Sequence, residues 1–274
     1  MDSAARLILV GDVDQLPSVG PGRVFGDLID SGVVPVTRLV KNHRQSGGGN
    51  IAANTKAVIN QKPGQPITWT QSTGVDGDFY IINQENPMER LQALKGAYRQ
   101  GRESGLSCLD IIVLTPEHDN TFGVNNINEV FQQEFNPTDH RILTNGREFR
   151  LGDPVRHTRN NYALGVMNGE TGVITEVGKE SLTVRYSNSR DVIYTTADLK
   201  ELSLAYAITI HQAQGSEWPM VLIPVYPSPL LTKNTLYTAI SRGKQLVVIV
   251  GRISALPPQC SKSGRPALLS RNTV

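Results

Sequence analysis

The order in which apolar runs and helical-spacing segments follow one another limits the fold of this chain more than any other feature. Short apolar runs predict strands at 6–10, 36–40, 79–83 and 109–115, and apolar residues at helical spacing predict helices at 24–29, 50–60, 87–102 and 124–135. After residue 200 the alternation returns, with a helix at 204–214, a strand at 219–225, a helix at 233–242 and a strand at 245–250. Strands that alternate with helices favour a parallel sheet, so an α/β fold is predicted.

Residues 151–200 interrupt this alternation. Short strand-like runs at 172–175 and 182–186 are separated there by glycine, asparagine and serine. This spacing is typical of antiparallel strands joined by turns, so we expect a small β-barrel inserted within the α/β domain. From residue 256 a tail rich in proline and serine has no periodicity, which predicts loose structure.

Composition excludes several classes of protein. No apolar stretch approaches the length of a membrane span, and the N-terminus does not resemble a signal peptide, so we expect a cytoplasmic protein with no membrane contact. Cys108 and Cys260 lie far apart and the five histidines are scattered, so neither a disulfide nor a metal site is expected. From Ser203 onward seven Lys and Arg stand against one acid, a net charge of +6. That asymmetry suits either a polyanion on one face or an ordinary basic tail.

The first polar motif is LVGDVDQLPSVGPG at residues 9–22, where a predicted strand ends in carboxylates and an amide. It resembles motif III of superfamily 1 DNA helicases of the RecD/TraA type. The resemblance implies that Gln15 senses the γ-phosphate of a nucleotide, and an amide suits this because it can donate to phosphate or accept from water. A shorter G-D-x-D-Q alone would favour an Asx-rich turn.

The second motif is RLVKNHRQ at residues 38–45. In the family that it resembles, the arginine at the position of Arg44 reaches the γ-phosphate across the cleft between two RecA-like domains. A guanidinium suits that role because its planar fork stays charged and meets two phosphate oxygens. Without this context, an exposed arginine is usually a solvated surface charge.

The third and most specific block comprises residues 204–218 and 236–244, which resemble motifs V and VI of the RecD/TraA group. By that resemblance Thr209 and His211 face single-stranded DNA, Gly215 and Glu217 lie near the nucleotide, and Arg242 is a second γ-phosphate arginine. If residues 204–214 form a helix, Thr209 and Ala213 share one face of it. On its own, His211 could equally be a hydrogen-bonded core histidine.

The inserted segment resembles the SH3-like domain that such helicases carry before motif V. Arg156, Arg159, Asn160 and Tyr162 offer charge and an aromatic ring, which grip a single strand without reading its sequence. The same composition also suits an ordinary solvated hairpin. Residues 117–120 depart from the family, because acidic and neutral residues replace a basic stretch.

The chain contains no G-x-x-x-x-G-K-[ST] phosphate loop and no Asp-Glu box before motif III. We therefore expect a fragment or truncated reading frame. ATP and Mg²⁺ are the cofactors of the intact family, and neither is expected to bind this chain alone. The predicted parts are a remnant of a first RecA-like domain (P-loop NTPase fold) at 1–35, a second RecA-like domain at 36–150 and 201–254, an SH3-like barrel at 151–200 and a tail at 255–274.

The resemblance implies the C-terminal motor half of a 5′ to 3′ DNA helicase of recombination or repair, unable to hydrolyse ATP alone. The alternatives are a binding module for single-stranded DNA or protein, a split helicase whose P-loop lies on a separate chain, and an inactive remnant. In the family that the chain resembles, the strand expected at 6–10 belongs to the first RecA-like domain, so here it would lack its neighbouring strands. A homodimer through residues 1–35 is therefore a further hypothesis.

Overall fold

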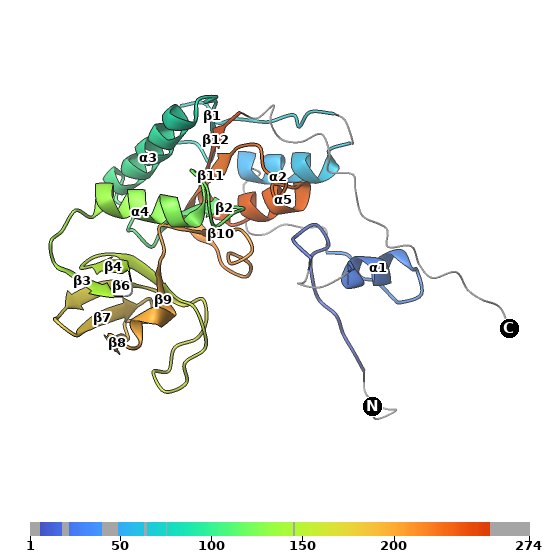
Figure 1. The fold of residues 1–274 in the computed structure, drawn as a ribbon. Coiled ribbons are helices and arrows are strands. Elements are labelled where there is room, and N and C mark those ends of the chain that lie inside the picture. The colour runs from blue at the N-terminus through green and yellow to red at the C-terminus, as the bar shows by residue number, and fades with distance from the viewer. Residues whose placement is uncertain are drawn as a thin grey trace.

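The core of the molecule is a five-stranded parallel sheet. The computed structural model describes residues 6–17, 22–39, 49–62, 65–74, 76–144 and 146–252 (Figure 1). Its strands are β1 (Phe79–Ile82), β2 (Ile111–Thr115), β10 (Ala207–Thr209), β11 (Trp218–Val225) and β12 (Gly243–Gly251), in the spatial order β1-β12-β11-β2-β10. Every neighbouring pair is parallel, so the predicted α/β class is confirmed.

Helices cover both faces of this sheet. Helices α2 (Asn50–Asn60) and α5 (Lys233–Ile240) pack on one face, and α3 (Pro87–Glu103) and α4 (Val124–Phe135) on the other. Along β11, Val221 and Ile223 belong to the first core cluster, whereas Met220 and Leu222 belong to the second. Because successive side chains point to opposite faces, a strand covered on both sides reads as a continuous apolar run.

The insertion is antiparallel, as predicted. It contains β5 (Pro154–His157), β6 (Thr171–Val177), β7 (Ser181–Tyr186), β8 (Asp191–Thr195) and β9 (Leu202–Leu204), in the order β8-β7-β6-β5-β9, with a short 3₁₀ helix η1 (Leu199–Glu201) before β9. The hairpin of β3 (Arg141–Thr144) and β4 (Arg147–Arg150) was not predicted. Its Ile142 and Phe149 join the apolar core of the insertion.

A buried carboxylate fastens the insertion to the sheet. Asp153 is 0% exposed, and its oxygens accept hydrogen bonds from Gln132 Nε2 at 2.6 Å and Asn136 Nδ2 at 2.7 Å, both from the region of α4. They also accept from the Arg150 N–H at 2.7 Å and the Tyr206 hydroxyl at 3.0 Å. Burial raises the pKa of Asp153 although these four donors favour the carboxylate. One side chain thus connects α4, the hairpin, β5 and the segment that leads into β10.

The helix predicted at 204–214 is wrong. Residues 207–209 form the edge strand β10, and residues 210–215 follow as turns. The outer edge of β10 is satisfied by Asn128 of α4, whose Nδ2 donates to the Ala207 carbonyl and whose Oδ1 accepts from the Ala207 N–H, both at 2.9 Å. The helix face predicted for Thr209 and Ala213 therefore does not exist.

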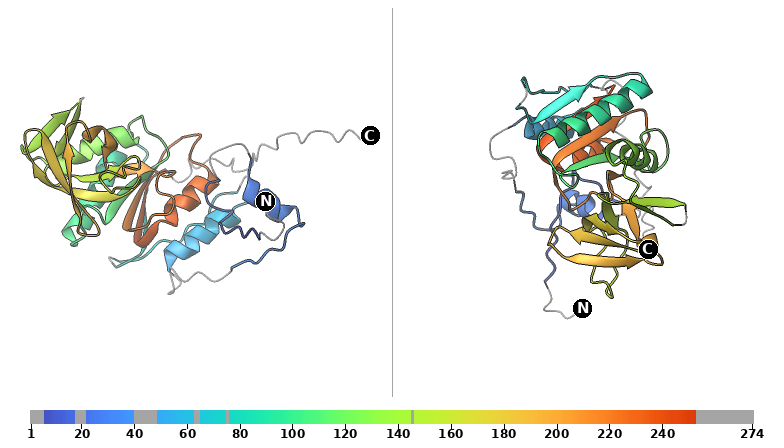
Figure 2. Two further views of the ribbon diagram at one scale, coloured as in Figure 1. Left: turned by 90° about the horizontal axis from the view of Figure 1, so that it is seen from below. Right: turned by 90° about the vertical axis from the view of Figure 1, so that its left-hand side faces the viewer.

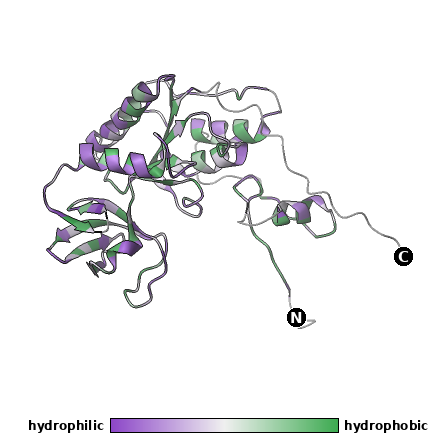
Figure 3. Ribbon diagram, in the orientation of Figure 1, coloured by the Kyte–Doolittle hydropathy of each residue, from purple (hydrophilic) through white to green (hydrophobic). Residues whose placement is uncertain are grey.

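Two predicted strands near the N-terminus are also absent. Residues 6–10 are extended but unpaired, and residues 36–39 form no strand, while residue 40 lies outside the described residues. Leu7, Ile8 and Val10 are 79%, 83% and 90% exposed, because no described strand lies beside them. Figure 3 shows this extended segment coloured as hydrophobic.

The N-terminal segment and the insertion lie at opposite ends of the α/β core (Figure 2). Helix α1 (Val24–Asp30), predicted from residues 24–29, belongs to this segment. None of the helices in the described part of the chain is both long and apolar enough to cross a membrane.

Candidate nucleotide groove and strand-binding surface

A groove of about 1010 Å³ separates the N-terminal segment from α5. Residues 9–17 and 23–26 line one side, and residues 229, 230, 232–235 and 237, before and within α5, line the other. His211 also lines it, from the turn after β10. Segments more than 200 residues apart in sequence therefore share one groove.

Two of the predicted γ-phosphate residues contact each other beside this groove. Arg242 Nη2 donates to Gln15 Oε1 at 2.5 Å. Arg242 is 3% exposed, and its guanidinium also donates to the carbonyls of Ser216 at 3.2 Å and Thr238 at 3.3 Å. Gln15 Nε2 in turn donates to Asp12 Oδ2 at 3.0 Å. Arg44, the third predicted residue of this group, lies outside the described residues.

One face of α5 holds the motif III loop in place. Its hydrogen bonds are from Asn234 Nδ2 to the Asp14 carbonyl at 2.9 Å, from the Tyr237 hydroxyl to Asp12 Oδ2 at 2.9 Å, and from the Leu16 N–H to Thr238 Oγ1 at 3.1 Å. Positions 234, 237 and 238 are spaced by three and four residues and so lie on one side of a helix. These three residues were not predicted from the sequence, although their helical spacing is visible in it.

The groove is acidic at the motif III end. Burial and the neighbouring Asp12 raise the pKa of Asp14, while Lys233, Arg23 and Arg38 lower it. Burial and Asp12 also raise the pKa of Tyr237. No group of three or more His, Cys, Asp and Glu side chains within the described ranges could hold a metal ion. The described residues of this groove fit one side of a phosphate, through the Gln15 amide and nearby cations, but supply no cradle for a whole triphosphate.

The turn after β10 connects this groove with the insertion. On the groove side, Gln214 Nε2 donates to the Leu16 carbonyl at 3.1 Å, and the Ser216 carbonyl accepts from Arg242. Gly215 has a φ of +81°, which favours glycine in this tight turn. Glu217 Oε1 lies 2.6 Å from Lys244 Nζ. Gly215 and Glu217, which are predicted to lie near the nucleotide, thus flank Ser216, the residue whose carbonyl contacts Arg242. Neither is among the residues that line the groove.

Thr209 and His211, the two residues of this segment predicted to contact DNA, do not lie on one exposed surface. Thr209 is 5% exposed, and its hydroxyl accepts from the Gln212 N–H at 3.2 Å while its own N–H donates to Gln212 Oε1 at 3.1 Å. His211 is exposed and lines the groove shared with motif III. The DNA contacts predicted for both residues remain predictions.

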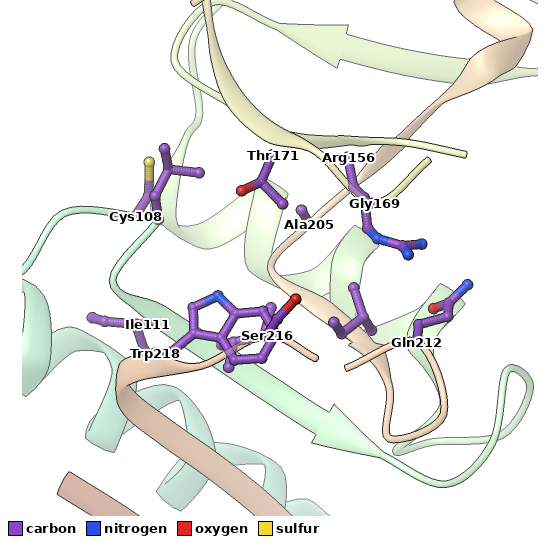
Figure 4. Close-up of a pocket in the computed structure, with 12 residues that line it drawn as sticks. Cys108, Ile111, Arg156, Gly169, Thr171, Ala205, Gln212, Ser216 and Trp218 are labelled. Carbon is purple, nitrogen blue, oxygen red and sulfur yellow. The ribbon is translucent and has the colours of Figure 1, made fainter. Parts of the chain in front are cut away.

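A crevice lies beside the same turn (Figure 4). Arg156, Gly169 and Thr171 line it from the insertion, and Gln212, Ser216 and Trp218 line it from the α/β core. The Arg156 guanidinium points towards Gln212 in Figure 4, and within the described residues it has no hydrogen bond or ion pair. Burial lowers its pKa. This unpaired cation suits an anion such as a phosphodiester.

The other three predicted DNA-binding residues lie on an exposed loop of the insertion. Tyr162 is 80% exposed, and Arg159 and Asn160 are also exposed. Asn160 Oδ1 accepts from the Asn168 N–H at 2.9 Å, across the loop. The structure therefore separates Arg156, in the crevice, from the loop that carries the other three.

Three segments of the chain match known protein families. Residues 1–75 match an AAA domain, residues 127–186 match the SH3 domain of ATP-dependent RecD-like DNA helicases, and residues 204–250 match the C-terminal domain of UvrD-like helicases. Over 256 residues, 92% of its length, the chain is 31% identical to an ATP-dependent RecD2 DNA helicase of Deinococcus radiodurans. The chain belongs to the RecD-like DNA helicase family.

A second relative of this RecD-like chain is the RecBCD enzyme subunit RecD of Mycobacterium tuberculosis, 32% identical over 262 residues and 90% of the chain. The chain spans 33% of the first relative and 45% of the second. Among solved structures, the Pif1 helicase from Bacteroides in complex with ADP-AlF₃ and single-stranded DNA is 18% identical, with a TM-score of 0.48, over 91% of this chain and 63% of that one. The SH3 match begins within α4 and includes the β3–β4 hairpin, whereas the barrel boundary at residue 151 stays a prediction.

Proposed function

We propose that this RecD-like chain is the C-terminal motor half of an ATP-dependent helicase that moves 5′ to 3′ on single-stranded DNA in recombination or repair. The observation that carries the proposal is the bond between Gln15 and Arg242, side chains 227 residues apart in sequence. It joins motif III to motif VI at the groove. Both side chains carry N–H donors that suit a γ-phosphate.

In the intact motor, Arg242 would donate to a γ-phosphate oxygen in place of the Gln15 oxygen, and the Gln15 amide would turn to donate to the same group. Bound ATP and Mg²⁺ would supply the phosphoryl group whose hydrolysis drives the motor. Arg44 would add a second guanidinium to that contact. Since the sequence has no glycine-rich phosphate loop, we expect this chain alone to have no ATPase activity.

The turn at residues 210–216 provides the coupling between nucleotide and DNA. Arg242 and Leu16 contact this turn from the groove side, through Ser216 and Gln214. Gln212 and Ser216 face Arg156 in the crevice beside the turn. A shift of Arg242 on nucleotide binding would therefore change the surface opposite Arg156 and alter the grip on the strand.

A second candidate is a binding module without catalysis, which could bind single-stranded DNA or dock on a protein. The unpaired Arg156 and the exposed Tyr162 favour the form that binds single-stranded DNA.

A split helicase is a third candidate, in which a separate chain supplies the P-loop domain. Residues 7–10 favour it, because they pair with no described strand and so offer an open edge to another sheet.

The proposal is tested by fluorescence anisotropy of labelled oligothymidine at low and moderate salt, with ATPase assays on the same samples. We expect binding that weakens steeply with salt, no turnover, and weaker binding after Arg156→Ala. Arg185→Ala is the matched control, because Arg185 is an exposed arginine of the insertion already paired with Asp191 at 2.8 Å.

Two outcomes contradict the proposal. Absence of salt-sensitive DNA binding would refute a strand-gripping half. Robust ATPase activity that Arg242→Ala abolishes would refute the need for a P-loop supplied from elsewhere.

A further inference from the structure

The loop that carries Arg159, Asn160 and Tyr162 is held by a residue outside it. Glu201, at the end of η1, is 8% exposed and faces the loop from the neighbouring segment. Its Oε2 accepts from Asn161 Nδ2 at 2.9 Å, and its Oε1 lies 3.6 Å from Arg159 Nε. One carboxylate therefore contacts two successive parts of the loop.

The backbone of Glu201 holds the start of the same loop. Its carbonyl accepts from the Thr158 N–H at 2.8 Å and from the Thr158 hydroxyl at 2.9 Å. On the core side, Nε2 of the fully buried His157 lies 3.4 Å from Glu201 Oε2. Glu201 thus sits between the insertion core and the loop, with its side chain fixed from both directions.

Asn161, which contacts Glu201, also bonds to residues on the far side of the loop. Its N–H donates to the Val166 carbonyl at 2.8 Å, and its carbonyl accepts from the Val166 N–H at 3.0 Å. Its Oδ1 accepts from the Leu164 N–H at 3.1 Å. These bonds close residues 161–166 into a ring that projects the 80% exposed Tyr162 into solvent.

We propose that Glu201 is a positioning residue for single-stranded DNA binding. Through Asn161 it holds residues 158–168 in the shape that presents Tyr162 to a base, and through Oε1 it orients the Arg159 guanidinium so that its outer nitrogens face a phosphate. Glu201 itself makes no contact with DNA. The inference rests on the proposed function, to which it adds a residue that neither the motifs nor the barrel composition indicated.

The first test compares Glu201→Ala with Glu201→Gln by anisotropy with labelled oligothymidine. Glutamine keeps an oxygen that can accept from Asn161, whereas alanine removes it. We expect the Kd of Glu201→Ala to rise about tenfold, the effect of losing one aromatic–base stack, and that of Glu201→Gln to rise only about two- to threefold, because its single oxygen can accept from Asn161 while its NH2 group faces Arg159. Tyr162→Ala should weaken binding in the unaltered chain and add little in the Glu201→Ala background, because both changes remove the same contact.

The second test follows hydrogen exchange of the Leu164 and Val166 amides, which requires no DNA. Both should exchange faster in Glu201→Ala than in the unaltered chain, while the amides of β6 and β7 stay protected. Glu180→Ala is the matched control, since Glu180 is an exposed glutamate between those two strands.

Normal DNA binding by Glu201→Ala beside normal binding by the unaltered chain would overturn this inference and leave the proposed function intact. Unchanged exchange of the two loop amides would overturn it as well. Failure of the unaltered chain to bind DNA would instead overturn the proposed function, and the role of Glu201 in DNA binding with it.

Discussion

Arg242 is a buried cation that donates to a side chain from the other end of the sequence, Gln15. At 3% exposure it cannot be solvated, so the Gln15, Ser216 and Thr238 oxygens take the place of water. Of these three oxygens, that of Gln15 belongs to a side chain that can rotate away, whereas those of Ser216 and Thr238 are backbone carbonyls. Gln15 is therefore the partner that a phosphate can replace without breaking the backbone contacts.

We predict a measurable coupling between Gln15 and Arg242 in stability. Gln15→Ala, Arg242→Ala and the double variant form a cycle whose interaction free energy should be about 1 kcal/mol, since a hydrogen bond to a charged donor is strong but Gln15 is only half-buried. Urea denaturation of the four proteins measures it. Additive effects would show that the contact does not stabilise the fold.

At the residue scale, the sequence motifs indicated which residues lie at the site but not which neighbours hold them in place. Gln15 and Arg242 were predicted to share a site, and they lie in contact. Asn161 and Glu201 were not predicted, because their role depends on a contact between segments 40 residues apart. Thr209 has the polar side chain expected of a DNA contact, yet it is buried in the turn that follows it.

Strand β10 shows why local periodicity failed at the edge of the sheet. Ile208 and Ile210 fit a period of two as well as they fit part of a helix, so the sequence alone does not distinguish a strand from a helix here. The segment is a strand because β2 pairs with one side of β10 and the Asn128 amide bonds to the backbone of Ala207 on the other. A helix would leave the open edge of β2 uncovered.

We predict that Asn128→Ala destabilises the fold by about 2–4 kcal/mol, since it leaves a buried N–H and a buried carbonyl of Ala207 without partners. The free energy of unfolding in urea measures the loss, and the amide of Ala207 should also exchange faster. Asn126→Ala is the control on the same helix, because Asn126 is only partly buried and its side chain donates to the nearby Thr121 carbonyl rather than to the sheet. Equal effects of the two changes would contradict the prediction.

We predict that the stability of the insertion depends on pH through its buried His157. Burial lowers the pKa of His157, although Glu201 and Glu170 raise it. Below pH of about 6.5 the unfolded chain takes up a proton that the folded chain resists, so the free energy of unfolding falls as the pH drops. The loss should reach up to about 1.4 kcal/mol between pH 7.5 and 5.5.

His157→Gln should remove this part of the pH dependence, whereas His140→Gln, at an exposed position, should leave it in place. Urea denaturation at both pH values gives the two differences. The same decline with pH in His157→Gln as in the unaltered chain would exclude His157 as its source.

For the whole molecule, the parallel core and the antiparallel insertion follow from patterns that repeat along the chain. The apolar run of β11 and the helical spacing of α3 needed no knowledge of distant partners to be recognised. The N-terminal segment could not be predicted in the same way, because the apolar run at residues 6–10 predicts a strand only if another strand lies beside it. Here the motif III loop is instead held by side chains of α5.

Residues 7–10 present an open apolar edge, so we predict that the chain self-associates through them as its concentration rises. Their side chains are 79%, 83%, 52% and 90% exposed, and their backbone groups pair with no described strand. Ile8→Lys combined with Val10→Lys should raise the dimer Kd at least about tenfold in sedimentation velocity, because pairing would bring like charges together. Val33→Lys, at a position 84% exposed outside this segment, should leave association unchanged. A dimer that survives the double substitution would place the contact elsewhere, and a monomer at every concentration would contradict the predicted self-association.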